Sequence, residues 1–188
     1  MRTTSAGSRS ISAPDRRPDP PAASGGRLAA ALTLVSLLWT ALIVAAPAAA
    51  TPTRSPLLSA LTYHAGSLVC HQRPDRSFHF DGRRFAVCAR CTGLYAGGAL
   101  GLLLAVGLRR RWSTGSTRIA LAVALMPIAA TVALEWLDLL STSNLARFAT
   151  GFPAGLVAGI VINGMLLAPS PRTIWTEPVE GGPRSRFP

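Results

Sequence analysis

The sequence contains no lysine, and this absence excludes one class of site at once. A phosphate-binding loop of the Gly-x-x-x-x-Gly-Lys type needs a lysine, so no nucleotide cofactor bound in that way is indicated. A Gly-x-Ser-x-Gly nucleophile elbow is also missing, so hydrolase chemistry has no visible nucleophile. The single Cys-x-x-Cys pair is followed by Thr92 instead of the histidine that covalent haem attachment requires.

Charged residues are scarce throughout the chain. Only 14% of the 188 residues are charged and 49% are hydrophobic, which is far more apolar than an ordinary soluble domain. A transmembrane helix needs about 20 apolar residues to cross about 30 Å of hydrocarbon. Four stretches meet or approach this length, at residues 28–49, 87–108, 119–140 and 148–168. We therefore expect an all-α membrane protein, a bundle of about four transmembrane helices whose main partner is the lipid bilayer.

The arginines are distributed as in a membrane protein. The net charge of +11 would suit nucleic acid, but the arginines flank apolar runs and do not gather in one folded segment, so no nucleic-acid partner is expected. Five arginines fall in residues 1–27, four in the loop 109–118 and three in residues 169–188, twelve in all, against seven elsewhere. The positive-inside rule then predicts a multi-pass protein of the cell membrane with both termini cytoplasmic. The segments 50–86 and 141–147 would be exoplasmic.

The two ends of the chain have the composition of disordered tails. Residues 1–27 and 169–188 are rich in Pro, Gly, Ser and Arg and poor in large apolar residues. The run Ala48-Ala49-Ala50 before Thr51 is similar to a signal-peptide cleavage site. The apolar run before it is longer than a signal core and the leader is long, so an uncleaved anchor at 28–49 is favoured, although cleavage of residues 1–50 stays open.

All three cysteines and two of the three histidines lie between Cys70 and Gly93. The segment before this stretch, residues 57–71, has apolar residues and histidines at helical spacing, which predicts a short amphipathic helix along the membrane surface. Those positions are Leu57, Leu61, His64, Leu68 and His71. Asp81-Gly82 is a weak signal for a tight turn in a small hairpin.

Small residues recur every four positions in two of the apolar runs. They are Gly93, Gly97, Gly101 and Ala105 in one run, and Gly151, Gly155 and Gly159 in the other. Such rows let helix backbones approach closely in lipid, so we expect these two helices to pair. The same rows leave a homo-oligomer open.

Further polar residues are expected at the cysteine end of the bundle. They are Arg90, Glu135, Asp138, Asn144 and Arg147. Ionisable residues near membrane helices are costly and mark functional positions by default. For Glu135 and Arg147, a purely structural ion pair is an equally good interpretation.

The cysteine stretch allows three kinds of chemistry. Cys70, His71, Cys88 and Cys91 form a plausible tetrahedral ligand set for zinc or a thiolate-rich site for iron. The alternative is a thiol-disulfide oxidoreductase, in which Cys88 and Cys91 react at a helix N-terminus beside Arg90 and exchange with Cys70. A third possibility is a structural disulfide in a membrane scaffold or transport component. One of the three cysteines would then be unpaired. Whether the chain is an enzyme stays open.

Two blocks of the sequence resemble a known family. The first is Cys70 to Phe78 (CHQRPDRSF), then Gly82, then Val87 to Gly97 (VCARCTGLYAG), and the second is Ser141 to Arg147 (STSNLAR) with Thr150, Gly151 and Gly155. Together they are similar to the prokaryotic integral membrane proteins grouped as domain of unknown function 2085, over residues 57–168. The resemblance implies an integral membrane protein and brings no established activity.

Overall fold

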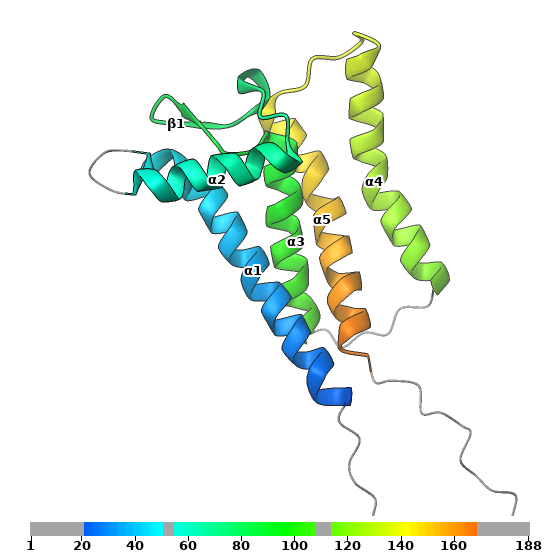
Figure 1. Cartoon of the computed structure of the whole chain (residues 1–188). Helices are drawn as coiled ribbons and strands as arrows, with labels where there is room; N and C mark the ends of the chain where they lie inside the picture. The colour runs from blue at the N-terminus through cyan, green and yellow to red at the C-terminus, as the bar shows by residue number, and fades with distance from the viewer. Residues whose placement is uncertain (1–20, 51–54, 108–113, 169–188) are drawn as a thin grey trace, which may run out of the picture.

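A computed structural model describes residues 21–50, 55–107 and 114–168, the side chains of residues 21–24 excepted. The described part contains five α-helices, α1 (Pro21–Ala49), α2 (Pro56–Val69), α3 (Ala89–Gly107), α4 (Thr114–Trp136) and α5 (Asn144–Leu166). A short 3-10 helix, η1 (Pro74–Arg76), and a two-stranded hairpin lie between α2 and α3. The predicted all-helical architecture is confirmed (Figure 1).

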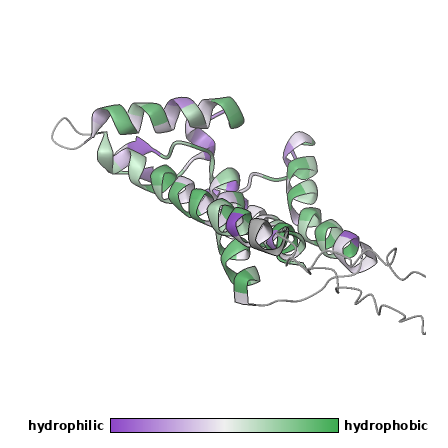
Figure 2. Cartoon of the chain, turned by 60° about the horizontal axis from the view of Figure 1, so that its bottom comes forward, coloured by the Kyte–Doolittle hydropathy of each residue, from purple (hydrophilic) through white to green (hydrophobic). Residues whose placement is uncertain are grey.

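Four helices of the described part are long and apolar enough to cross a membrane. These spans are Gly25–Ala49, Ala89–Gly107, Thr114–Trp136 and Asn144–Leu166. Apolar residues run along each of them (Figure 2). The shorter α2 lies across one end of the bundle, beside the hairpin (Figure 1). The fold therefore has four candidate crossings and a small polar cap at one end.

The helix boundaries differ from the expected ones at several places. α1 begins at Pro21, so residues 21–27 are helical and do not belong to a tail. α4 begins at Thr114 and ends at Trp136, although the apolar run continues through Leu140. The end of α4 is set by Asp138, which has a left-handed φ of 54°. The N–H of Leu139 then bonds the carbonyl of Leu134 at 3.0 Å, as in a Schellman motif.

Local hydrogen bonds also set where α3 and α5 begin. α3 starts at Ala89, two residues after the expected Val87, with Cys88 accepting the N–H of Thr92 at 2.9 Å. α5 starts at Asn144, four residues before expected, because the Ser143 hydroxyl caps the N–H of Ala146 at 3.2 Å. The expected tails at 1–20 and 169–188 and the arginines of loop residues 109–111 lie outside the described residues.

The weakly signalled hairpin is present. β1 (His79–Phe80) pairs antiparallel with β2 (Arg83–Arg84), in the register His79 to Arg84 and Phe80 to Arg83. Asp81 and Gly82 between them both have positive φ, 50° and 71°. Two positive φ values are the signature of a type I′ turn, in which glycine carries no steric penalty. The hairpin gives the polar cap a fixed shape between η1 and α3.

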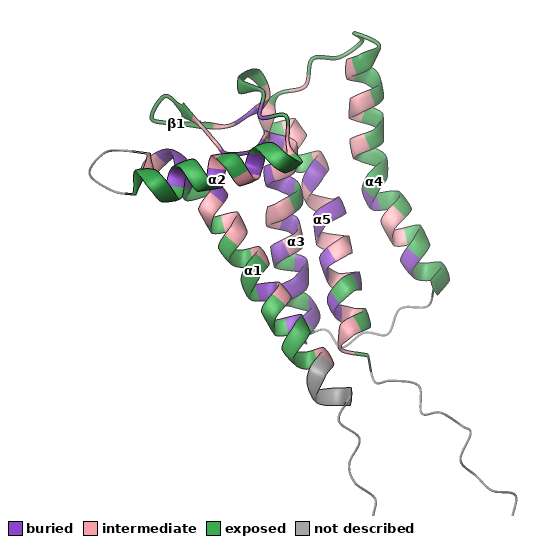
Figure 3. Cartoon of the chain, in the orientation of Figure 1, coloured by how far each residue is buried: buried purple, intermediate pink, exposed green. Residues whose placement is uncertain are grey.

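The predicted pairing of the two glycine-rich helices is the main helix contact of the fold. A Cβ added at Gly93, Gly97 or Gly101 of α3 would collide with backbone atoms of α5. A Cβ added at Gly151, Gly155 or Gly159 of α5 would collide with backbone atoms of α3. Both rows are therefore used within one chain, and the facing sides of α3 and α5 are buried (Figure 3).

A buried asparagine ties α1 to this pair. Asn163 of α5 is fully buried and donates to the carbonyl of Leu102 in α3 at 2.7 Å and to the hydroxyl of Thr33 in α1 at 3.0 Å. Helix α4, in contrast, packs mainly against α5 and exposes most of its surface (Figure 3). The bundle thus has a tight three-helix part and a peripheral fourth helix.

The glycine contacts predict a position-specific loss of stability. Gly97→Ala places a methyl group against the carbonyl oxygen of Phe152, so we expect the free energy of unfolding to fall by about 1–3 kcal/mol. Gly107→Ala is the matched control, because nothing lies within 4 Å of a Cβ at that position. Thermal unfolding of both variants in detergent measures the difference. Equal melting temperatures for the two variants would contradict backbone packing of α3 on α5.

Candidate functional site

The three cysteines meet at the capped end of the bundle. Their sulfur atoms all lie within 4.8 Å of one another, and all three are free thiols of intermediate exposure. Cys70 follows the last residue of α2, whereas Cys88 and Cys91 stand immediately before and within the first turn of α3. The group is therefore assembled from two segments that are 18 residues apart at Cys70 and Cys88.

The geometry of the group follows from the ends of two helices. The N–H of Cys70 bonds the carbonyl of Gly66 at 3.0 Å, which closes α2 and leaves the Cys70 backbone extended. Cys88 and Cys91 are three residues apart at the start of α3, so their side chains lie on the same side of the helix. The N–H of Cys88 donates to the Cys70 sulfur at 3.2 Å, and the N–H of Gln72 does so at 3.5 Å. These bonds hold the third sulfur beside the pair.

The environment of Cys70 favours its thiolate form. Hydrogen bonds from the Cys88 thiol and then from the Cys91 thiol lower the pKa of Cys70, and burial opposes them. The backbone N–H groups of Cys88 and Gln72 lower that pKa further. Hydrogen bonds to the charged form of a group stabilise that form, so the site is chemically prepared to present sulfur as an anion.

Gln72 positions the site, and sequence reasoning missed it. Its side chain is buried and its Nε2 donates to the carbonyls of Tyr63 at 2.6 Å and Ala86 at 2.7 Å. Its backbone has a left-handed φ of 49°, and its carbonyl accepts from Arg84 at 2.6 Å. A glutamine directly after a Cys-His pair carries no local signal for this role, because its partners come from α2 and from the segment before α3.

His71 is not part of the compact sulfur group. Its side chain is exposed, and among the described residues the only group of three or more close metal-ligating side chains is Cys70, Cys88 and Cys91. His71 does line the cavity beside the sulfurs. The other two histidines, His64 and His79, are exposed as well.

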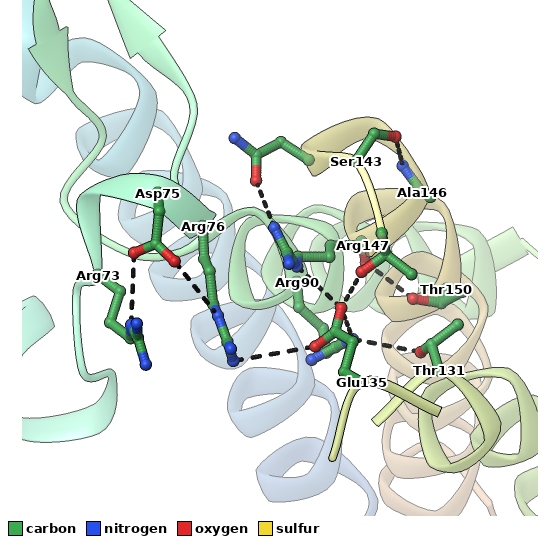
Figure 4. Close-up of polar contacts among 12 residues, drawn as sticks. Arg73, Asp75, Arg76, Arg90, Thr131, Glu135, Ser143, Ala146, Arg147 and Thr150 are labelled. Carbon is green, nitrogen blue, oxygen red and sulfur yellow. Dashed lines mark hydrogen bonds and ion pairs between the residues drawn. The ribbon is translucent and has the colours of Figure 1, made fainter. Parts of the chain in front are cut away.

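A cluster of arginines surrounds one carboxylate next to the thiols. Glu135, at the end of α4, lies 3.1 Å from Arg147 of α5, 3.6 Å from Arg90 of α3 and 3.9 Å from Arg76 of η1. Arg90 also donates to the hydroxyl of Thr131 in α4 at 3.2 Å. Figure 4 shows the three guanidinium groups converging on Glu135. We call Arg76, Arg90, Arg147 and Glu135 the arginine cluster.

Of the two remaining polar residues expected at this end of the bundle, Asn144 contacts the arginine cluster and Asp138 does not. Asn144 accepts from Arg147 at 3.1 Å and donates to the carbonyl of Ser77 at 2.9 Å, which links α5 to η1. Asp138 is exposed in the turn after α4, where its role is the left-handed backbone that ends the helix. Arg76 was not among the expected residues, because it belongs to a loop whose fold the sequence only weakly indicates.

A cavity of about 260 Å³ opens beside the sulfur atoms. Its lining consists of Val69, Cys70, His71, Gln72, Arg73, Arg76, Cys88, Arg90, Cys91 and Arg147. The thiols and the arginine cluster therefore share one partly enclosed space. It is large enough for a small ligand that touches both.

Replacing Gln72 tests how the site is held together. Gln72→Ala removes the two hydrogen bonds that Nε2 makes to the carbonyls of Tyr63 and Ala86, so we expect the free energy of unfolding to fall by about 1–3 kcal/mol. Cys70 should then react faster with a maleimide, because the segment that positions its sulfur is loosened. His79→Ala, at an exposed histidine outside the cavity lining, is the control and should leave the melting temperature close to that of the wild type. Unchanged stability and labelling in Gln72→Ala would count against the positioning role.

Comparison with known proteins places the chain in a family. No solved structure matches it. An uncharacterised protein of Methanocaldococcus jannaschii is 35% identical over 106 residues, 52% of this chain and 64% of that protein, so the chain spans less than two thirds of it. An uncharacterised protein of Methanothermobacter thermautotrophicus is 33% identical over 88 residues, 47% of this chain and 78% of that protein. The family match covers residues 70–161, from the first cysteine into α5, and the chain belongs to this family, described as predicted membrane protein (DUF2085).

Proposed function

We propose that this membrane protein binds one zinc or iron ion through Cys70, Cys88 and Cys91. The observation that carries the proposal is the close approach of three sulfur atoms, all within 4.8 Å of one another. Sulfurs that hold zinc tetrahedrally at about 2.3 Å from the metal lie roughly 3.8 Å apart. The three cysteines thus need little rearrangement to bind an ion.

The surroundings of the sulfurs support a charged thiolate site. Backbone N–H groups point at the Cys70 sulfur, and such bonds orient and stabilise metal-bound thiolates. The N-terminus of α3 adds a partial positive charge at Cys88 and Cys91. A divalent ion with three thiolates carries about one net negative charge, which the neighbouring arginines would offset.

Three protein ligands leave a fourth tetrahedral position. His71 is the proposed fourth ligand, because it lines the same cavity and follows Cys70 directly. Its ring would have to turn toward the sulfurs from its exposed position. If His71 stays out, the site has the three-ligand form that zinc enzymes keep open for water or substrate.

The metal content of purified protein tests the proposal. We expect about one zinc or iron ion per chain after purification in detergent without oxygen or chelator, and loss of the ion in Cys88→Ser. Loss of a structural metal should also loosen the cap and increase the proteolysis of residues 72–86. Metal content that is the same in wild type and Cys88→Ser would contradict the proposal.

A pair of histidine variants decides the fourth ligand. His71→Ala should weaken metal affinity if His71 binds the ion, whereas His79→Ala, an exposed histidine that does not line the cavity, should not. Competition with a chelator of known affinity measures both. Equal metal affinities of the two variants would mean that the ion has three protein ligands and that His71 is not one of them.

A thiol-disulfide oxidoreductase is the second candidate. It is favoured by the same three free thiols and by the lowered pKa of Cys70. With oxidised glutathione as the oxidant, two cysteine thiols would form a disulfide while glutathione is reduced to two thiols. In Cys91→Ser, the Cys70–Cys88 disulfide should then accumulate and be visible by mass spectrometry. If no such disulfide forms and metal is bound, the redox candidate is excluded.

We also propose that the thiol site faces the exoplasm, with both termini of this multi-pass cell-membrane protein in the cytoplasm. Support comes from the arginine-rich loop 109–118, which lies between two candidate spans. A membrane-impermeant maleimide should therefore label the native cysteines in intact cells once a membrane-impermeant chelator has removed bound metal. A chain with Ser113→Cys and all three native cysteines changed to serine should be labelled only after permeabilisation. Labelling of Ser113→Cys in intact cells, with the native cysteines labelled only after permeabilisation, would contradict this topology and support the opposite one.

A further inference from the structure

We propose that the cavity beside the cysteines binds a phosphate group, held by Arg76, Arg90 and Arg147. The ligand is either free phosphate or the phosphate of an anionic lipid at the membrane surface. This binding does not depend on a metal ion, so it goes beyond the function proposed above. It gives the arginine cluster a role that a structural ion pair does not explain.

The first observation is the charge of the cavity lining. Of the ten residues that line it, four are arginines and none is acidic. Arg73 has its own exposed partner in Asp75, at 3.3 Å. The other three guanidinium groups are those of the arginine cluster. The lining thus contains several positive side chains and no carboxylate, and it also contains the three thiols.

The second observation is that the positive charge of the cluster is not balanced. The side chains of Arg90 and Arg147 are only 18% and 11% exposed, and both depend on the same carboxylate, that of Glu135. Arg76 shares Glu135 with them and also lies 3.6 Å from exposed Asp75. Buried charges are costly unless they are paired, and one buried carboxylate cannot balance two or three guanidinium groups. A further anion at this place would reduce that cost.

The third observation is the presence of unused donors. The Nε atoms of Arg76 and Arg90 are buried and have no hydrogen-bond acceptor in the described part of the chain, and Arg76 Nε is only ion-paired, 3.6 Å from a carboxylate oxygen of Asp75. Guanidinium groups bind the oxygens of phosphate through paired N–H donors. The three arginines approach from η1, α3 and α5, which suits an anion with several oxygens more than a flat carboxylate.

Glu135 acts as an internal competitor for these arginines. The cavity walls are mostly apolar. The guanidinium groups turn their ends toward Glu135 (Figure 4). A bound phosphate would share or replace this partner. Glu135 belongs to the peripheral helix α4, so phosphate binding would also weaken the attachment of the α4 end to the cap.

The size and position of the cavity admit both sources of phosphate. Its volume of about 260 Å³ exceeds that of a few water molecules, each of which occupies about 30 Å³ of liquid. Val69, which is exposed at the end of α2, forms part of the lining. The neighbouring Leu57, Leu61 and Leu68 of α2 are also exposed, which suits a helix at the lipid surface. A lipid headgroup can thus reach the same arginines as free phosphate.

Equilibrium binding to the full chain tests the proposal. Radiolabelled inorganic phosphate should bind saturably to the protein in an uncharged detergent, with and without prior removal of metal by a chelator. In the second arm, the protein is placed in phosphatidylcholine nanodiscs with or without phosphatidylglycerol. If the lipid is the source, phosphatidylglycerol should displace labelled phosphate; if it does not, the ligand is free phosphate.

The variants are expected to change the affinity for phosphate in opposite directions. Arg90→Gln and Arg147→Gln should each weaken phosphate binding roughly tenfold or more, because each removes charged hydrogen bonds. Arg83→Gln, an exposed arginine of β2 outside the cavity lining, should bind like the wild type. Glu135→Gln should bind phosphate several-fold more tightly, because the competing carboxylate is gone.

Three results would overturn the proposal. One is the absence of saturable phosphate binding and of any phosphatidylglycerol effect in the wild type. Another is weaker binding in Glu135→Gln, which would mean that the cluster only holds the fold together. The third is loss of binding on metal removal, which would assign the anion to the metal. Metal content is measured in a separate experiment, so a negative result for phosphate does not affect the metal proposal. If the arginine variants do not fold, Glu135→Gln alone decides.

Discussion

The backbone contact between α3 and α5 is the constraint on which the rest of the structure depends. Six glycines let the two helices touch along their length, and a methyl group at any of them would meet backbone atoms of the partner. This contact brings the N-terminal ends of both helices together at the capped end. Cys88 and Cys91, just before and within the first turn of α3, then line the same cavity as Arg147 of α5. The chemistry of the site is thus a consequence of close helix packing in lipid, which van der Waals contact drives.

The second constraint is charge at the edge of an apolar bundle. Glu135 is the buried carboxylate that joins α4 to η1, α3 and α5, and it is paired with more arginine than it can balance. Thiolates, a metal-thiolate group or a bound anion each supply negative charge at this place. The thiol site and the arginine cluster are therefore complementary in sign. Their common cavity suits a function in which sulfur and an anionic ligand meet at the membrane surface.

Much of the fold could be predicted from the sequence, because membrane helices follow from local composition. The four crossings, the glycine pairing and the Asp81-Gly82 turn all depend on residues close in the chain. Helix ends were harder to predict. The apolar Leu139 and Leu140 suggest a longer α4, but the left-handed Asp138 ends it earlier. The role of Gln72 could not be predicted, since its partners Tyr63 and Ala86 lie in other segments of the chain.

The proposed function depends most on the binding of one ion by three sulfurs. X-ray absorption at the metal edge of the anaerobically purified protein measures this directly, because it counts the sulfur ligands and their distances. We expect three sulfurs at about 2.3 Å if the ion is zinc, with one lighter atom completing the coordination. An ion surrounded by oxygen and nitrogen alone would contradict it, as would sulfur ligation that survives when all three cysteines are replaced by serine.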